Sequence, residues 1–307
     1  MIKRFAGSHP YRAVSSRSPF DFAAVNSHSL IVGSSGSGKS FLVSKLFPSP
    51  SGLVLFKPDG VFPDVPLASV SGLLSPFDFR AYDVADAYLY ALGLDISGIM
   101  ASSLVPVVMS ALSGSKDFKG FYGSLDALGS EKIYSSVVSI VRSHFSVLYP
   151  VWSNRRGRPR KSPSTFDRSV SSISFAGLGF FRSEFGAELF LRGLYSSIGS
   201  DFGTLVIDEF HHVARSGSVI DTLLREFRVS GQLVAITQSL SDVSPSMLSN
   251  FGYILLGRSV HPDDLVYLER LSPQLPALVA GLPPRVFLSL TEYLADPDPV
   301  PLYGWVD

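Results

Sequence analysis

The chain has 307 residues, enough for one large domain or for a core domain with an insertion, and 46% of them are hydrophobic. Its 26 Lys and Arg residues balance 26 Asp and Glu residues, so any contact with a polyanion must be local. The absence of cysteine excludes disulfide frameworks, thiolate zinc sites and cysteine nucleophiles. The sequence contains neither a clean run of about 20 apolar residues nor the apolar core of a secretory signal. We therefore expect a cytoplasmic protein without a membrane span.

Within the first 80 residues, an aperiodic lead-in is followed by segments in which apolar residues recur in a pattern. Residues 1–28 are rich in Ser, Pro and aromatic residues without a sustained period, which predicts an extended segment packed on a core. The apolar run 29–32 predicts a strand, and a glycine-rich turn separates it from a helix predicted over 39–47. A second apolar run, 52–56, predicts a strand that leaves into a Lys-Pro-Asp-Gly turn.

The middle of the chain is predicted to be helical, and the part after it is predicted to alternate between strands and helices. Apolar residues recur at spacings of three and four between 81 and 150, and the basic stretch 153–168 predicts an exposed loop. Further strands are predicted at 172–175, 204–207 and 232–237, with helices between them. This alternation predicts an α/β fold with a parallel sheet. The predicted parts are a lead-in (1–28), a core in two parts (29–80 and 171–270), a helical insertion between them (81–170) and a C-terminal tail (271–307).

The motif GSSGSGKS follows the first predicted strand and precedes a predicted helix, which is the context of a phosphate-binding loop. Glycines let backbone N–H groups point inward around a phosphate, and Gly33, Gly36 and Gly38 supply that freedom. Lys39 is expected to reach the β- and γ-phosphates of ATP, and Ser40 to offer its hydroxyl to Mg²⁺. A glycine–serine linker with a chance lysine is the alternative. The residues expected to bind the nucleotide are Gly33, Ser34, Ser35, Gly36, Ser37, Gly38, Lys39, Ser40 and Phe41.

An acidic pair, Asp208 and Glu209, follows the strand predicted at 204–207. Asp208 is placed to hold the Mg²⁺ shell, and Glu209 to polarise the attacking water as general base. A helix cap is the alternative for this pair. His211 and His212 come next, and because adjacent side chains diverge on a helix or strand, we expect packing or supporting roles and not a metal site.

Gln238 ends the strand predicted at 232–237. A polar residue at the tip of a strand between the phosphate-binding and acidic strands can sense the γ-phosphate, so we assign Gln238 that catalytic role. An ordinary turn glutamine is the alternative.

With these motifs in this order, the chain resembles the HerA/FtsK superfamily of ring-forming, DNA-pumping ATPases, and its HerA-like branch above all, over most of residues 29–270. Beyond the phosphate-binding loop, the resemblance rests on the acidic pair, an arginine-containing helix end running into a glycine, a strand ending in Thr-Gln, a Leu-Ser-Asn segment and a Pro-Asp-Asp turn. These are Asp208-Glu209, Arg225 and Arg228 with Gly231, Thr237-Gln238, Leu248-Ser249-Asn250, and Pro262-Asp263-Asp264.

The resemblance implies a RecA-like P-loop ATPase core, a hexameric ring with ATP at subunit interfaces, and duplex DNA in the pore. A neighbouring subunit would donate an arginine finger, for which Arg228 is the first candidate and Arg225 the second. A compact member fits genome packaging or DNA transfer of a virus or mobile element, in the host cytoplasm or the virion, with a capsid or membrane-associated protein as a further partner. The alternative is a nucleotide-dependent switch or assembly ATPase that acts on a protein without pumping DNA.

Five positive charges lie within residues 154–161 of this neutral chain. The Arg-Gly-Arg-Pro core of this segment looks like an AT-hook, in which an extended backbone lays arginines along the minor groove of A·T-rich DNA. Contact with DNA phosphates alone, or a solvated loop, are the alternatives. The candidate DNA contacts are Arg155, Arg156, Arg158, Arg160 and Lys161.

Overall fold

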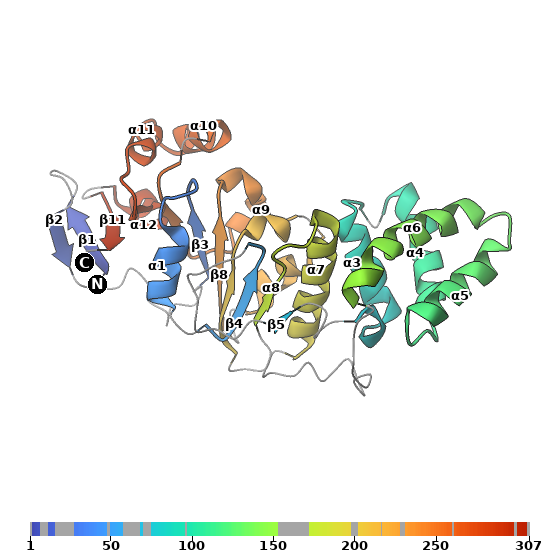
Figure 1. The fold of residues 1–307 in the computed structure, drawn as a ribbon. Helices are drawn as coiled ribbons and strands as arrows, with labels where there is room; N and C mark the ends of the chain where they lie inside the picture. The colour runs from blue at the N-terminus through green and yellow to red at the C-terminus, as the bar shows by residue number, and fades with distance from the viewer. Residues whose placement is uncertain are drawn as a thin grey trace. The chain divides into compact units, whose positions relative to one another are not determined.

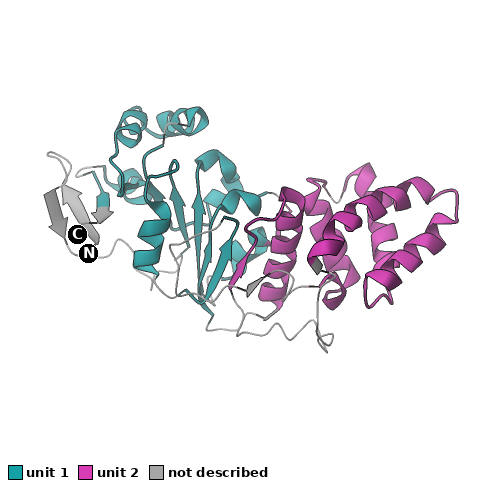
Figure 2. Cartoon of the chain, in the orientation of Figure 1, with its two compact units in different colours: residues 1–66, 199–216, 220–307 teal, residues 67–198, 217–219 magenta. Residues whose placement is uncertain are grey.

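The chain divides into two compact units in the computed structural model (Figure 2). Unit 1 comprises Met1–Pro66, Gly199–Ser216 and Ile220–Asp307, and unit 2 comprises Leu67–Ile198 and Gly217–Val219. The described residues are 2–6, 12–15, 28–47, 50–57, 68–69, 75–95, 97–152, 172–197, 202–215, 217–227, 231–259, 261–297 and 300–305.

Unit 1 is built on a mixed sheet whose strands follow the order β2-β1-β11-β10-β9-β3-β8-β7-β4. Figure 1 labels β2, β1, β11, β3, β8 and β4 of this sheet. The central strands β9, β3, β8, β7 and β4 are parallel, while β10, β11 and β1 continue the sheet in antiparallel pairs. The bounds are β1 (Ile2–Ala6), β2 (Arg12–Ser15), β3 (Ser29–Val32), β4 (Gly52–Leu55), β7 (Gly203–Ile207), β8 (Gly231–Thr237), β9 (Tyr253–Leu256), β10 (Val286–Ser289) and β11 (Leu302–Trp305).

The predicted α/β core is confirmed. The strands expected at 29–32, 52–56, 204–207 and 232–237 are β3, β4, β7 and β8, with ends that agree to within about a residue, the usual uncertainty of strand limits. The sheet departs from a wholly parallel one at the edge where β10 pairs with β9. Hydrophobic patterning reports which residues are buried in a strand but carries no information about strand direction, which is why this edge was not foreseen.

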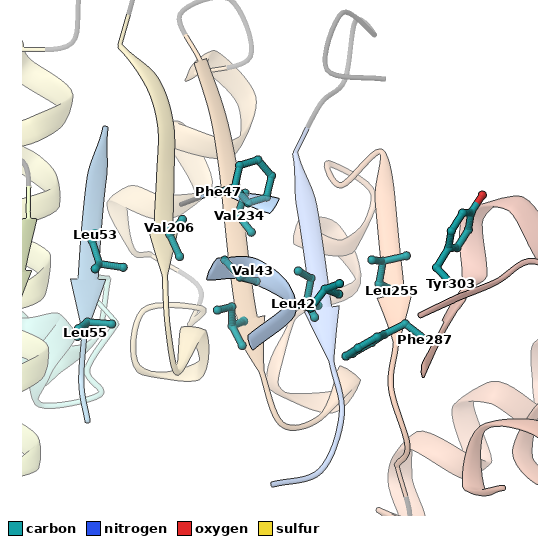
Figure 3. Packing of buried hydrophobic residues seen from close by; sticks show 12 residues of the cluster. Leu42, Val43, Phe47, Leu53, Leu55, Val206, Val234, Leu255, Phe287 and Tyr303 are labelled. Atoms are coloured by element: carbon teal, nitrogen blue, oxygen red, sulfur yellow. The ribbon is translucent and has the colours of Figure 1, made fainter. Parts of the chain in front are cut away.

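Helix α1 (Lys39–Leu46) covers one face of the sheet and begins directly at the phosphate-binding loop. Its Leu42 and Val43 are buried against side chains that come from several strands of the sheet (Figure 3). This packing fixes the N-terminal end of α1 relative to the carboxyl end of β3. The cluster comprises Ile31, Leu42, Val43, Phe47, Leu53, Leu55, Val206, Val234, Ile236, Leu255, Phe287 and Tyr303.

The remaining short helices of unit 1 lie between its strands. They are η2 (Phe210–His212), η4 (Leu240–Asp242), α9 (Pro245–Leu248), α10 (Pro262–Leu271), α11 (Leu275–Ala280) and α12 (Leu290–Ala295). Helix α8 (Val219–Glu226) starts in the segment assigned to unit 2 and continues in unit 1.

Unit 2 is mainly helical, with an aromatic core that includes Tyr88, Phe121 and Phe145. Its elements are β5 (Ala68–Ser69), η1 (Pro76–Asp78), α3 (Ala81–Ala91), α4 (Ile99–Leu112), α5 (Phe118–Gly129), α6 (Ser135–Trp152), β6 (Ser172–Ser174) and α7 (Phe180–Ser197). Among the described helices of the chain, none combines the length and apolar character needed to cross a bilayer.

Candidate nucleotide-binding site

Four neighbouring parallel strands of unit 1 place polar side chains at one edge of the sheet. Strand β3 leads into the loop 33–40, β8 ends before Gln238, β7 before Asp208 and Glu209, and β4 is followed closely by Lys57. Parallel strands present their carboxyl ends at the same edge, which is where ligands bind in open α/β sheets. Since β8 separates β3 from β7, the ends of these two strands lie about 10 Å apart.

The phosphate-binding loop requires glycine for two different reasons. Gly36 and Gly38 have φ angles of 79° and 95°, in the region that only glycine adopts readily. Gly33 does not need this freedom, contrary to the expectation for all three glycines. A Cβ atom there would lie 2.8 Å from Ser37 Oγ and 3.3 Å from the carbonyl oxygen of Arg258, so Gly33 is required by the close approach of neighbouring atoms.

Segments far along the chain hold this loop in place. The amide of Ser34 donates to the carbonyl oxygen of Arg258 at 2.8 Å, and the amide of Arg285 donates to that of Ser37 at 2.8 Å. Arg285 has a φ angle of 65°, and its guanidinium lies 4.7 Å from the centroid of the Phe41 ring. Arg285 was not among the predicted site residues, and no sequence motif marks it.

Lys39 is the first residue of α1, and its ammonium lies within the loop. Nζ donates to the carbonyl oxygens of Gly33 at 2.6 Å and Ser34 at 3.1 Å. Burial lowers the pKa of Lys39, although the nearby carboxylates of Glu209 and Asp208 oppose this effect. The structure thus brings the predicted phosphate-binding lysine and the predicted acidic pair into one electrostatic environment.

Glu209 lies two residues past the end of β7 in a left-handed backbone conformation, with φ 49° and ψ 52°. This conformation costs a non-glycine residue about 1–2 kcal/mol. Its carboxylate forms an ion pair with Lys57 and accepts hydrogen bonds from Gln238 Nε2 at 3.0 and 3.2 Å. Burial alone would raise the pKa of Glu209, but the bonds from Lys57 and Gln238 outweigh it and the pKa falls below the usual value.

The two histidines after the acidic pair lie close to it. His211 Nδ1 is 3.4 Å from Glu209 Oε2, and His212 stacks on Phe56 with a centroid distance of 4.4 Å. Burial lowers the pKa of both rings, so the neutral forms are favoured. Asp208 is buried beside them, and its amide donates to the carbonyl oxygen of Val54 on β4.

The loop after Gln238 is organised by a buried carboxylate on α10. Asp264 is 1% exposed and accepts hydrogen bonds from the Ser239 and Ser259 hydroxyls and from the amides of Leu240 and Ser241. The sequence marks Asp264 only as part of a Pro-Asp-Asp turn. Its position shows that this turn fixes the backbone next to Gln238.

A cavity of about 510 Å³ opens beside the phosphate-binding loop. It is lined by residues of this loop and of the segments that follow β7, β8 and β9, so its wall combines hydroxyl, amide, imidazole and carboxylate groups. The lining residues are Ser34, Ser35, His211, Gln238, Ser239, Asp242, Ser259, His261 and Pro262.

The remaining predicted site residues lie partly outside the described chain. Arg225 is exposed on α8, where its Nε donates to the carbonyl oxygen of Asp221 at 3.0 Å. Arg228, the other candidate for the arginine finger, lies outside the described residues. The candidate DNA contacts also lie outside them: Arg155, Arg156, Arg158, Arg160 and Lys161.

Comparisons with known proteins identify the fold. No protein-family model matches the chain, and no relative is found among curated proteins. Among solved structures, plasmid coupling protein TrwB in complex with ADP and Mg²⁺ matches with a TM-score of 0.64 and 16% identity, over 94% of this chain and 90% of that one. VirB4 of Thermoanaerobacter pseudethanolicus matches with a TM-score of 0.60 and 16% identity, over 87% of each chain. The chain therefore shares the fold of these proteins.

Proposed function

We propose that this protein is an ATPase that hydrolyses MgATP at the carboxyl edge of its sheet. The observation that carries the proposal is the grouping of a phosphate-binding loop, an acidic pair and Gln238 on three adjacent parallel strands. Lys39 would bind the β- and γ-phosphates, and the N-terminal end of α1 would face the same anion. The match to TrwB supports this, because that structure contains ADP and Mg²⁺.

The residues present suit Mg²⁺. This ion prefers hard oxygen ligands and keeps several of its waters, so it needs few protein ligands when phosphates supply others. Ser40 offers a hydroxyl and Asp208 a buried carboxylate. No cluster of three or more His, Cys, Asp or Glu side chains suited to a metal occurs within the described ranges. When bound, Mg²⁺ would neutralise charge on the phosphates.

Glu209 and Gln238 would act on the attacking water. The water oxygen forms a bond to the γ-phosphorus, the bond from that phosphorus to the ADP oxygen breaks, and the water proton passes to the Glu209 carboxylate. Gln238 already contacts Glu209 at 3.0 Å, so it links the water-activating group to the strand beside the phosphate-binding loop.

We further propose that hydrolysis drives the movement of DNA, in genome packaging or DNA transfer. The fold supports this role, because one match is a plasmid coupling protein and another structure of it is described as a bacterial conjugative coupling protein. A ring of copies, expected to be a hexamer, would place Arg228 or Arg225 of one subunit against the nucleotide of the next. The basic segment 154–161 would bind DNA phosphates.

The decisive experiment measures MgATP turnover by the full-length protein with and without duplex DNA. We expect DNA to stimulate turnover, Lys39→Ala to abolish it, and Glu209→Gln to bind ATP without hydrolysing it. Normal hydrolysis by Glu209→Gln would exclude Glu209 as the base. Turnover that does not change when DNA is added would favour the alternative function, a nucleotide-dependent switch that acts on a protein partner.

A further inference from the structure

Both oxygens of the Glu209 carboxylate contact protein groups. Lys57 and Gln238 contact Oε1, while Gln238 also donates to Oε2 at 3.0 Å and His211 Nδ1 lies 3.4 Å from Oε2. Only 10% of this side chain is exposed. A general base must accept a hydrogen bond from the water that it activates, at about 2.6–3.2 Å. Oε1 already receives two donors, Lys57 and Gln238, so a water that approaches this oxygen must displace one of them.

Lys57 is the contact best suited to open. It extends from the end of β4, the strand next to β7, and 56% of its side chain is exposed. Its ammonium can therefore return to water at little cost, whereas Gln238 is only partly exposed and adjoins the loop that Asp264 holds. The other lysine of the site, Lys39, is held within the phosphate-binding loop by two carbonyl oxygens.

We propose that Lys57 is a positioning residue that holds Glu209 in a resting conformation, and that hydrolysis requires this ion pair to open. The inference rests on the proposed ATPase function and adds a restraint on the hydrolysis step. Lys57 touches the water-activating carboxylate and acts on the reaction through it. The left-handed backbone conformation of Glu209 fixes the position of its Cβ atom. The position of the carboxylate then depends on the groups that it contacts.

The test compares steady-state MgATP kinetics of the full-length wild type with Lys57→Met and Lys57→Arg, without DNA. Met matches the length of lysine but cannot hold the carboxylate, so kcat should rise about two- to fivefold, the range that partly exposed ion pairs contribute. The KM for ATP should stay unchanged because Lys57 acts after binding. Lys57→Arg restores an ion pair and should return kcat to the wild-type value.

Lys132→Met is the matched control, since it removes an exposed lysine of unit 2 and should leave kcat unchanged. Thermal unfolding of each variant checks that it is folded. An unchanged or lower kcat for folded Lys57→Met would overturn the proposal, as would a KM that rises with kcat unaltered. If the wild type itself hydrolyses no ATP, the proposed ATPase function fails instead, so the two failures are distinguishable.

Discussion

Replacing Asp264 by alanine tests whether the buried carboxylate on α10 supports the catalytic edge. Oδ1 accepts from the amide of Leu240 at 2.8 Å and that of Ser241 at 3.3 Å, and the Ser239 and Ser259 hydroxyls donate to the same carboxylate. In Asp264→Ala the hydroxyls can rotate, and those of Ser239 and Ser241 already contact each other at 2.7 Å. The buried Leu240 amide cannot rotate and loses its acceptor, whereas the Ser241 amide keeps a second acceptor in Ser239 Oγ at 3.2 Å. At about 1–3 kcal/mol for one unsatisfied buried amide, the free energy of unfolding should fall by about 1–3 kcal/mol.

Asp264→Asn is the matched control. The amide keeps a carbonyl oxygen in the place of Oδ1, and its NH₂ group can donate to the Ser259 hydroxyl, so the loop keeps its hydrogen bonds. Loss of the charge leaves these hydrogen bonds in place, so Asp264→Asn should be more stable than Asp264→Ala.

Thermal unfolding and ATP turnover measure the two consequences. Asp264→Ala should lower Tm by at least about 2 °C, and Asp264→Asn by less than the alanine variant. Because Ser239 adjoins Gln238, the alanine variant should also lower kcat between about 10- and 100-fold, as expected for a displaced positioning group. Equal Tm values for the two variants would refute the reasoning, because it depends on the acceptor and not on the charge.

Three further predictions concern other parts of the chain. Gly33→Ala should weaken ATP binding at least about tenfold in a fluorescent-nucleotide titration, because its Cβ would lie 3.3 Å from the Arg258 carbonyl oxygen and displace the loop. Arg285→Gly should be more stable than Arg285→Ala by about 1–2 kcal/mol in thermal unfolding, because both lose the stack on Phe41 but only glycine relieves the φ of 65°. Burial lowers the pKa of His144 below 6.5, so only the unfolded chain takes up this proton as pH first drops below 6.5. Between pH 7 and pH 5, the Tm of His144→Gln should therefore fall by less than the Tm of the wild type, and equal decreases would contradict this.

The parts of the site that could be predicted are those encoded locally. The phosphate-binding loop is a contiguous motif, and the apolar run before Asp208 marks the end of a strand whatever its neighbours are. Parallel strands then bring such ends to one edge, so Gln238 could be assigned to the site from its position alone. The reason for Gly33 could not be predicted, because it depends on atoms of residues 257 and 258.

The contacts that could not be predicted depend on strand order. Lys57 ends an apolar strand just as Asp208 and Gln238 do, so the same rule places it at the edge of the sheet. Its ion pair with Glu209 joins residues 152 positions apart and requires β4 to lie next to β7, which hydrophobic patterning does not specify. The order of the strands thus places this lysine beside the proposed water-activating carboxylate, and the rate of Lys57→Met tests whether it restrains that group.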